Sequence, residues 1–221
     1  MAVTMADISH LRKMSGAGMM DCKKALEEAG NDFDKAMEII RKKGQAVAAK
    51  RSDREASEGC VLAAENAGFA AIVALKCETD FVAKNEQFVA LTQDILNVAM
   101  SVKPETVEAL LASPLADGRA IQEHITDRVG VTGEKMELGF YQFVNGASSV
   151  SYIHPGNKLA TIVAFNEAVD HTVARDVAMQ VAAMNPVAVR AEEVPQNVID
   201  TEMEIARDKA RQSGKPENLL D

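Results

Sequence analysis

The chain has 221 residues, long enough for one or two domains that each bury a core, and only 4% of its residues are aromatic. Its net charge of −9 is unevenly spread, with 11 Lys and Arg against 8 Asp and Glu in residues 1–54 and 13 against 25 in residues 55–221. A body this acidic would repel phosphate backbones, which argues against direct binding of nucleic acid by most of the chain.

Three short helices are expected in residues 1–45. Thr4 can cap the first helix, and the glycines of "SGAG" allow a tight reversal before the second. Asn31 or Asp32 can cap the third helix, which Gly44 is expected to end. Residues 46–57 are small or charged and are predicted to be a linker, helical in part, that is either solvated or binds a polyanion.

An internal repeat follows the linker. The stretch "VLAAENAGFAAIVAL" from Val61 is echoed by "VSYIHPGNKLATIVAF" from Val150, and each is a pair of strand-like runs that leads into a helix. The pattern predicts an α+β fold with two related core subdomains and antiparallel sheets, at residues 58–138 and 139–190. Residues 191–221 are predicted to be a helical segment that starts a hairpin.

The first copy of the repeat has extra length at "CETDFVAKNEQF", residues 77–88, where a strand meets a helix. Phe81 at this corner has two interpretations. It can turn inward as the first core residue of the helix, seven positions before Phe88. It can instead stand outward beside Asp80 and enter a pocket on a partner, and the spacing alone leaves both interpretations open.

A second contact surface is expected at "GAGMMDCKK", where Met19 and Met20 are adjacent and cannot both face one small core. The alternative is that one methionine is buried and the other is an ordinary exposed apolar residue. Catalytic motifs are weak, because the histidines have no ligand spacing and the three cysteines no Cys-x-x-Cys spacing. Cys77 with His154 as nucleophile and base is supported by no motif. Without a signal peptide or a long apolar span, the chain is expected in the cytoplasm, with no membrane contact.

Two stretches carry a resemblance to a known family. "LRKMSGAGMMDCKKALEEAGNDFDKAMEIIRKKG" and "CETDFVAKNEQF" are similar to the two signature regions of the elongation factor Ts family, the guanine-nucleotide exchange factors for elongation factor Tu. "YIHPGNK" and "ARQSGKPENL" are similar to the same family. The resemblance covers the chain from about Ala6 to Asp221.

The resemblance implies which residues contact the partner, elongation factor Tu, in its GDP-bound and nucleotide-free forms. The N-terminal helices are implied to form a ubiquitin-associated-like module that contacts the nucleotide-binding domain through Arg12, Met19, Met20 and Lys23. The corner is implied to enter the same domain near its magnesium site through Thr79, Asp80, Phe81 and Val82. Two further matches are Gly133, in a bridge between the subdomains, and His154, which approaches another domain of the partner.

The same resemblance implies a mechanism. Phe81 would act as a wedge beside the phosphate loop of the partner, and Asp80 would disturb the hydrogen bonds that hold magnesium and its waters, so that GDP leaves. The chain itself is expected to need no catalytic residue, metal or cofactor. An adaptor that uses the three-helix module alone, without exchange activity, is the alternative. Because the family continues past "GKP", a chain ending at Asp221 is expected to be truncated, and its self-association is undecided.

Overall fold

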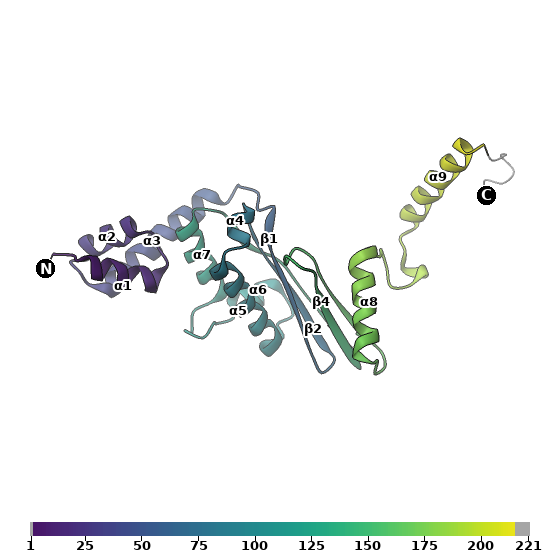
Figure 1. Cartoon of the computed structure of the whole chain (residues 1–221), viewed down its shortest axis with the longest axis horizontal. Helices are drawn as coiled ribbons and strands as arrows, with labels where there is room; N and C mark the ends of the chain where they lie inside the picture. The colour runs from purple at the N-terminus through teal and green to yellow at the C-terminus, as the bar shows by residue number, and fades with distance from the viewer. Residues whose placement is uncertain (1, 215–221) are drawn as a thin grey trace. The chain divides into compact units, whose positions relative to one another are not determined.

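The computed structural model describes residues 2–214, which belong to two compact units, residues 1–182 and 183–221. The first unit begins with three helices (Figure 1), α1 (Met5–Ser15), α2 (Met19–Glu28) and α3 (Phe33–Arg51). They share a small core made of Ile8, Leu11, Ala17, Cys22, Ala25, Leu26 and Ala36. Thr4 Oγ1 accepts a hydrogen bond from Asp7 N at 3.2 Å, and Asp32 Oδ1 accepts one from Lys35 N at 3.1 Å. These caps begin α1 and α3, so the prediction of three N-terminal helices is confirmed.

Helix α3 is longer than predicted, because Gly44 does not end it. The helix continues to Arg51 and takes up the first half of the predicted linker, residues 46–57. Gly44 lies where α3 crosses α7 (Ile121–Thr132), and a Cβ built on Gly130 of α7 would lie 2.4 Å from the Gly44 Cα. A glycine here allows the two helix backbones to touch. This close packing explains why α3 contains a glycine in its interior, although glycine destabilises a helix there.

The main core lies between a three-stranded antiparallel sheet and three helices. The strands are β1 (Glu58–Asn66), β2 (Phe69–Cys77) and β3 (Met136–Asn145), in the order β1-β2-β3. The helices that cover one face of the sheet are α5 (Glu86–Val102), α6 (Val107–Ala112) and α7 (Figure 1). The large side chains fully buried between them include Leu75, Phe88, Ile95, Leu96, Leu110, Ile121 and Ile125. The α+β class is therefore as predicted.

Strand β3 crosses the predicted boundary between residues 138 and 139. It pairs with β2 along its whole length, from Cys77 opposite Met136 to Phe69 opposite Asn145. Met136, Leu138 and Tyr141 are buried in the main core, which is why this strand joins the first sheet and not a second subdomain. The sheet thus draws on both of the predicted core segments.

The second copy of the repeat has the expected hairpin followed by a helix. The hairpin β4 (Ser148–Ile153) and β5 (Ala160–Phe165) packs against α8 (His171–Met184) through Val150, Ala174 and Ala178. Residues 166–170 connect β5 to α8, whereas residues 78–85 connect β2 to α5 and include the short helix α4 (Asp80–Ala83). The connection is therefore three residues longer in the first copy, so part of the extra length of that copy lies at the corner.

In the second unit, η1 (Ala191–Glu193) precedes α9 (Gln196–Gln212), the helix expected from the sequence. Residues 215–221, which include the end of the predicted hairpin segment, lie outside the described residues. Within residues 2–214, no helix is both long enough and apolar enough to span a membrane.

Candidate functional site

The candidate site is the corner between β2 and α5. The corner contains two helix starts in close succession, because Thr79 caps α4 and Asn85 caps α5. Asn85 Oδ1 accepts hydrogen bonds from the backbone N–H groups of Gln87 at 3.0 Å and Phe88 at 3.3 Å. A chain that stops one helix and starts another within a few residues is fixed at both ends, so its exposed side chains have defined positions.

Phe81 points out of this corner and is 85% exposed, the highest exposure of any phenylalanine in the described chain. Its neighbour Val82 packs against the main core, and Ala83 is buried there. The inward interpretation of Phe81 is wrong because α4 ends at Ala83 and a new helix begins after Asn85. The seven-residue spacing to Phe88 therefore joins two different helices and does not define one face.

Glu134 holds the start of α4 in place. Its Oε2 accepts a hydrogen bond from Thr79 N at 3.0 Å, and its Oε1 accepts one from Thr79 Oγ1 at 2.6 Å. Both polar groups of Thr79 are thus bound within the chain. Glu134 follows Gly133, which ends α7 in the left-handed conformation with φ 73° and so lets the backbone turn toward the corner. No local sequence pattern indicates this contact, because Thr79 and Glu134 are 55 positions apart.

Glu78 anchors the corner from its other side. Its Oε1 accepts from Lys135 N at 2.7 Å, and its Oε2 accepts from Arg54 Nη1 at 3.0 Å. Arg51, in the last turn of α3, lies 3.6 Å away. The backbone hydrogen bond from Lys135, then the Arg54 side chain, lowers the pKa of Glu78, so this anchor is an ionised carboxylate at neutral pH.

Asp80 stands beside Phe81 with its carboxylate at the surface. Its Oδ2 accepts a hydrogen bond from Lys84 Nζ at 2.7 Å. That hydrogen bond and the charge of Lys84, with a smaller contribution from Lys158, lower the pKa of Asp80. Asp80 does not serve as the helix cap, because Thr79 does, and Lys84 binds its carboxylate at the surface.

The turn that contains His154 lies on the same part of the molecule as the corner. Lys158 of this turn pairs with Glu58 at the start of β1, and Asn157 O accepts a hydrogen bond from Val61 N at 2.7 Å. The hydrogen bond with Glu58, its charge and the more distant charge of Asp80 raise the pKa of Lys158, against an opposing effect of burial. His154 itself is exposed, and its Nδ1 is 2.9 Å from the hydroxyl of Tyr152.

The predicted N-terminal contact residues lie on the surface of the three-helix module. Met19 is 42% exposed and Met20 63% exposed at the start of α2, so neither belongs to the core. Arg12 is exposed on α1, and Lys23 on α2 forms a surface pair with Glu27, at 3.7 Å. The alternative in which one of the two methionines is buried is therefore wrong.

Of the four predicted N-terminal contact residues, Arg12 lies close to the helix that follows the corner. An open hollow of about 440 Å³ is lined by Ser9, Arg12, Lys13, Gly16 and Gln87, and Gln87 is the second residue of α5. Gln87 Oε1 also accepts a hydrogen bond from Arg128 Nη2 of α7 at 2.7 Å. Gln87 thus joins α5 to α7 beside the N-terminal module.

Cys77 is not placed for nucleophilic chemistry. It is fully buried, and burial followed by the charge of Glu134 raises its pKa to about 12. In residues 2–214, the ring nitrogens of His154 form a hydrogen bond with Tyr152 and none with a sulfur. The same described residues contain no group of three or more His, Cys, Asp and Glu side chains that could hold a metal ion.

We expect Cys22, Cys60 and Cys77 to resist thiol reagents in the folded chain, because all three are buried. For a pKa of about 12, only about one Cys77 thiol in ten thousand is ionised at pH 8. Labelling with iodoacetamide, followed by mass spectrometry, checks this with and without denaturant. Rapid labelling of Cys77 in the native protein would contradict the expected burial, and complete labelling in denaturant is the positive control.

Comparison with known proteins gives a consistent result. The family model described as "Elongation factor TS" matches residues 78–221. A protein named elongation factor Ts from Porphyromonas gingivalis is 74% identical over 221 residues, which cover 100% of this chain and 81% of the relative. A protein of the same name from Azobacteroides pseudotrichonymphae is 56% identical over 222 residues, which cover 100% of this chain and 81% of the relative. One from Bacteroides fragilis is 60% identical over 212 residues, with 96% of this chain and 64% of the relative covered.

Proposed function

Because the chain belongs to the elongation factor Ts family and thus to the factors of translation elongation, we propose that it is a guanine-nucleotide exchange factor for elongation factor Tu. The observation that carries the proposal is Phe81, an aromatic ring that is 85% exposed on a corner fixed by four internal contacts. A large apolar side chain held out in water by an ordered turn is placed to be buried in a partner.

The proposed mechanism is a linkage between two binding equilibria. A factor that binds nucleotide-free elongation factor Tu more tightly than the GDP-bound form must lower the affinity for GDP by the same ratio. Phe81 is the wedge that enters the nucleotide-binding domain. Asp80 disturbs the hydrogen bonds that hold magnesium and its waters, because its carboxylate competes as an acceptor for the donors in that region. Loss of magnesium leaves the phosphates of GDP less well neutralised, and GDP dissociates.

The remaining residues of the site hold or extend this contact. Met19 and Met20 offer flexible apolar side chains that adapt to the partner surface, and Arg12 and Lys23 add positive charge beside them. His154 is proposed to approach another domain of elongation factor Tu, because its turn is anchored next to the corner. The proposed place of action is the cytoplasm, where translation occurs, and the mechanism involves no bond making by this chain.

An adaptor that binds ubiquitin-like proteins through the three-helix module is the second candidate. The module is a separate small core, as such an adaptor requires. The adaptor gives no role to the ordered corner or to the exposed Phe81, which is why the exchange factor is the better proposal. The two candidates differ in what they bind and in their effect on nucleotide release.

The test is release of a fluorescent GDP analogue from elongation factor Tu in excess unlabelled GDP. Catalytic amounts of the chain are expected to accelerate release, in a reaction that needs no other cofactor. An unchanged release rate with the chain in molar excess would overturn the proposal. Binding to a ubiquitin-like protein without any effect on GDP release would favour the adaptor instead.

A further inference from the structure

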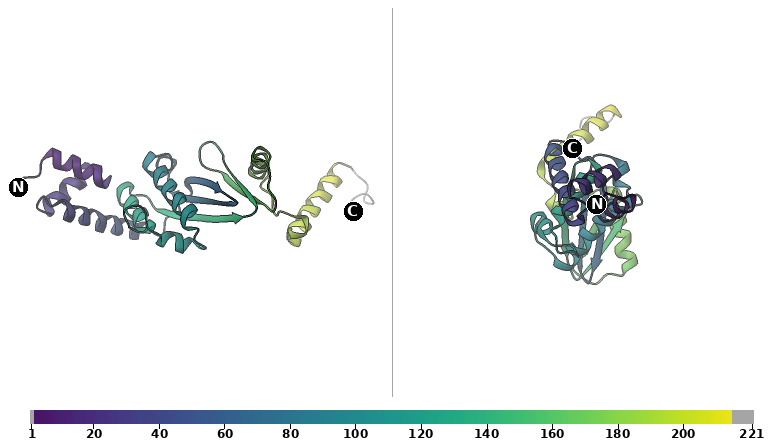
Figure 2. Two further views of the ribbon diagram at one scale, coloured as in Figure 1. Left: turned by 90° about the horizontal axis from the view of Figure 1, so that it is seen from below. Right: turned by 90° about the vertical axis from the view of Figure 1, so that its left-hand side faces the viewer.

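Helix α3 links the two predicted contact surfaces. Its first half belongs to the core of the N-terminal module, where Ala36 is buried and Lys43 pairs with Asp21 of α2. Its last turn carries Arg51, which lies 3.6 Å from Glu78 at the base of the corner. A continuous helix of 19 residues spans about 28 Å at 1.5 Å per residue. Figure 2 (left) shows this helix running from the N-terminal helices to the core.

The helix is fixed midway by its crossing with α7. At this point Gly44 and Gly130 face each other, and there is less room for a side chain at position 130 than at position 44. A Cβ on Gly130 would lie 2.4 Å from the Gly44 Cα, whereas a Cβ on Gly44 would have no neighbour nearer than 3.4 Å. Only a residue without a side chain fits at position 130, so the backbones of α3 and α7 are in direct contact.

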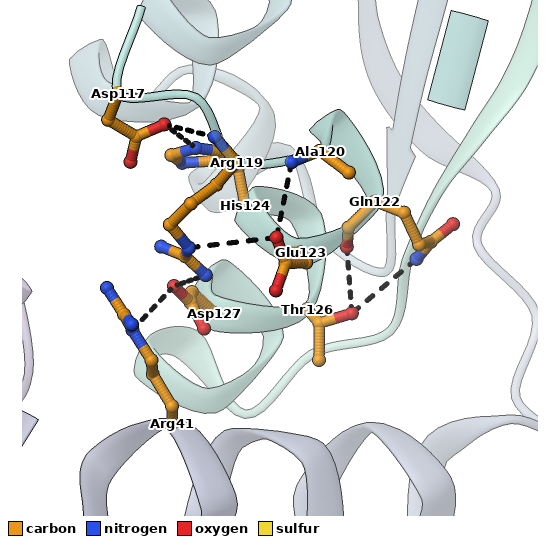
Figure 3. Close-up of polar contacts among 9 residues, drawn as sticks. All are labelled: Arg41, Asp117, Arg119, Ala120, Gln122, Glu123, His124, Thr126 and Asp127. Carbon is orange, nitrogen blue, oxygen red and sulfur yellow. Dashed lines mark hydrogen bonds and ion pairs between the residues drawn. The ribbon is translucent and has the colours of Figure 1, made fainter. Parts of the chain in front are cut away.

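Charged side chains hold the two helices together on one side of the crossing (Figure 3). Arg41 of α3 extends toward Asp127 of α7, with its Nε 4.0 Å from Asp127 Oδ2. Arg119 Nη2 lies 2.8 Å from the same oxygen, and Arg119 Nε lies 3.8 Å from Glu123 Oε2. The shared carboxylate of Asp127 thus joins α3 to α7 and to the segment before it.

We propose that α3 is a rigid spacer that sets the separation between the N-terminal contact residues and Phe81, and that Gly130 is the positioning residue for this spacer. The inference rests on the proposed function, since both surfaces are taken to bind one molecule of elongation factor Tu. When two contacts are held at the correct separation, the second forms without a further loss of translational and rotational entropy. The two contacts then contribute to one binding event. The end of this spacer, residues 46–51, is the first half of the segment that the sequence predicts to be a linker.

Replacing Gly130 by Ala tests the spacer. The added methyl group must push α3 away from α7, which shifts the module relative to the corner. We expect KM for the GDP complex of elongation factor Tu to rise about 10- to 100-fold, because the two contacts no longer form together. The maximal release rate at saturating concentration is expected to persist, because Phe81 and its anchors are unchanged.

Two matched variants control for a general effect of the substitution. Gly44→Ala places the same methyl group at the same crossing, but with neighbours at 3.4 Å and beyond, so a smaller rise in KM is expected. Gln122→Ala changes an exposed position of α7, and KM is expected to stay at the value of the unaltered chain. A variant that merely unfolds would lose active protein, which lowers the maximal rate and leaves KM unchanged.

A distance measurement tests the spacer without elongation factor Tu. Spin labels on Lys24→Cys of α2 and Glu108→Cys of α6 use exposed positions, and the native cysteines are buried. The free chain is expected to give one narrow distance distribution, and Gly130→Ala a shifted or broader one. A broad distribution in the unaltered chain, or a shift in Gly130→Ala without a change in KM, would overturn the spacer. Failure of the unaltered chain to release GDP would instead overturn the proposed function, whatever the distances show.

Discussion

Replacing Phe81 by Ala is expected to lower kcat/KM for GDP release about 10- to 100-fold, because burying one phenylalanine contributes about 1.5–3 kcal/mol. The ring makes little contribution to folding, since 85% of it is exposed. The free energy of unfolding should therefore change by no more than about 0.5 kcal/mol. Stopped-flow release of a fluorescent GDP analogue measures the first effect, and urea denaturation measures the second.

Phe140→Ala is the matched control for this variant. Phe140 lies on β3, away from the corner sequence, and is 46% exposed, so part of its ring is packed against the protein. Its removal should cost more stability than removal of Phe81 and should leave GDP release unchanged. A wedge role for Phe81 would be excluded if Phe81→Ala released GDP as fast as the unaltered chain. An equal fall of kcat/KM in Phe81→Ala and Phe140→Ala would show that GDP release responds to any loss of exposed apolar surface.

The local features of the fold could be predicted from the sequence. Short-range hydrogen bonds define the starts of α1 and α3, and Thr4 and Asp32 are typical capping residues. The two hairpins follow from pairs of apolar runs separated by a turn. The inward face of α5 follows from the helical spacing of Phe88, Leu91 and Ile95, all of which are buried. Each of these features depends on residues that are close together in the sequence.

The features that the sequence could not provide depend on distant residues. Gly44 has the local pattern of a helix end, but the approach of Gly130 makes it a helix crossing. Strand β3 precedes the second hairpin in sequence, yet its pairing with β2 places it in the first sheet. Phe81 differs from these two cases, because the break that decides its orientation is local: α4 ends at Ala83 and Asn85 caps a new helix. For Gly44 and β3, the deciding partner is an element that the local pattern does not contain.

Thr79 shows how the structure changes the interpretation of a single residue. The family resemblance implies that it contacts the partner together with its three neighbours. In the free chain, its backbone N–H and its hydroxyl are both bound to Glu134. Its hydroxyl is also 3.5 Å from Val82 N, as expected of a helix cap. These contacts support a role in which Thr79 orients α4, so that Phe81 and Asp80 face outward.

Replacing Glu134 by Ala is therefore expected to reduce GDP release although Glu134 is proposed to contact no nucleotide. The substitution leaves two polar groups of Thr79 without their partner, and each hydrogen bond to a charged acceptor contributes about 1.5–3 kcal/mol. Part of this loss should appear as reduced stability of the corner, measured as faster hydrogen exchange of the α4 amides. The rest should appear as a kcat about tenfold lower, because a wedge that is not held in place enters the partner less often in the productive geometry.

Glu134→Gln separates geometry from charge. Its amide oxygen can accept from Thr79 N while its amide nitrogen donates to Thr79 Oγ1, so both contacts can persist without the negative charge. We expect GDP release to recover most of the rate lost in Glu134→Ala. Glu137→Ala removes a carboxylate three positions away that forms surface ion pairs with Lys76 and Lys135, and it should leave both GDP release and α4 hydrogen exchange unchanged. If Glu134→Gln were as slow as Glu134→Ala, the charge and not the bracing of Thr79 would be the property that matters at this position.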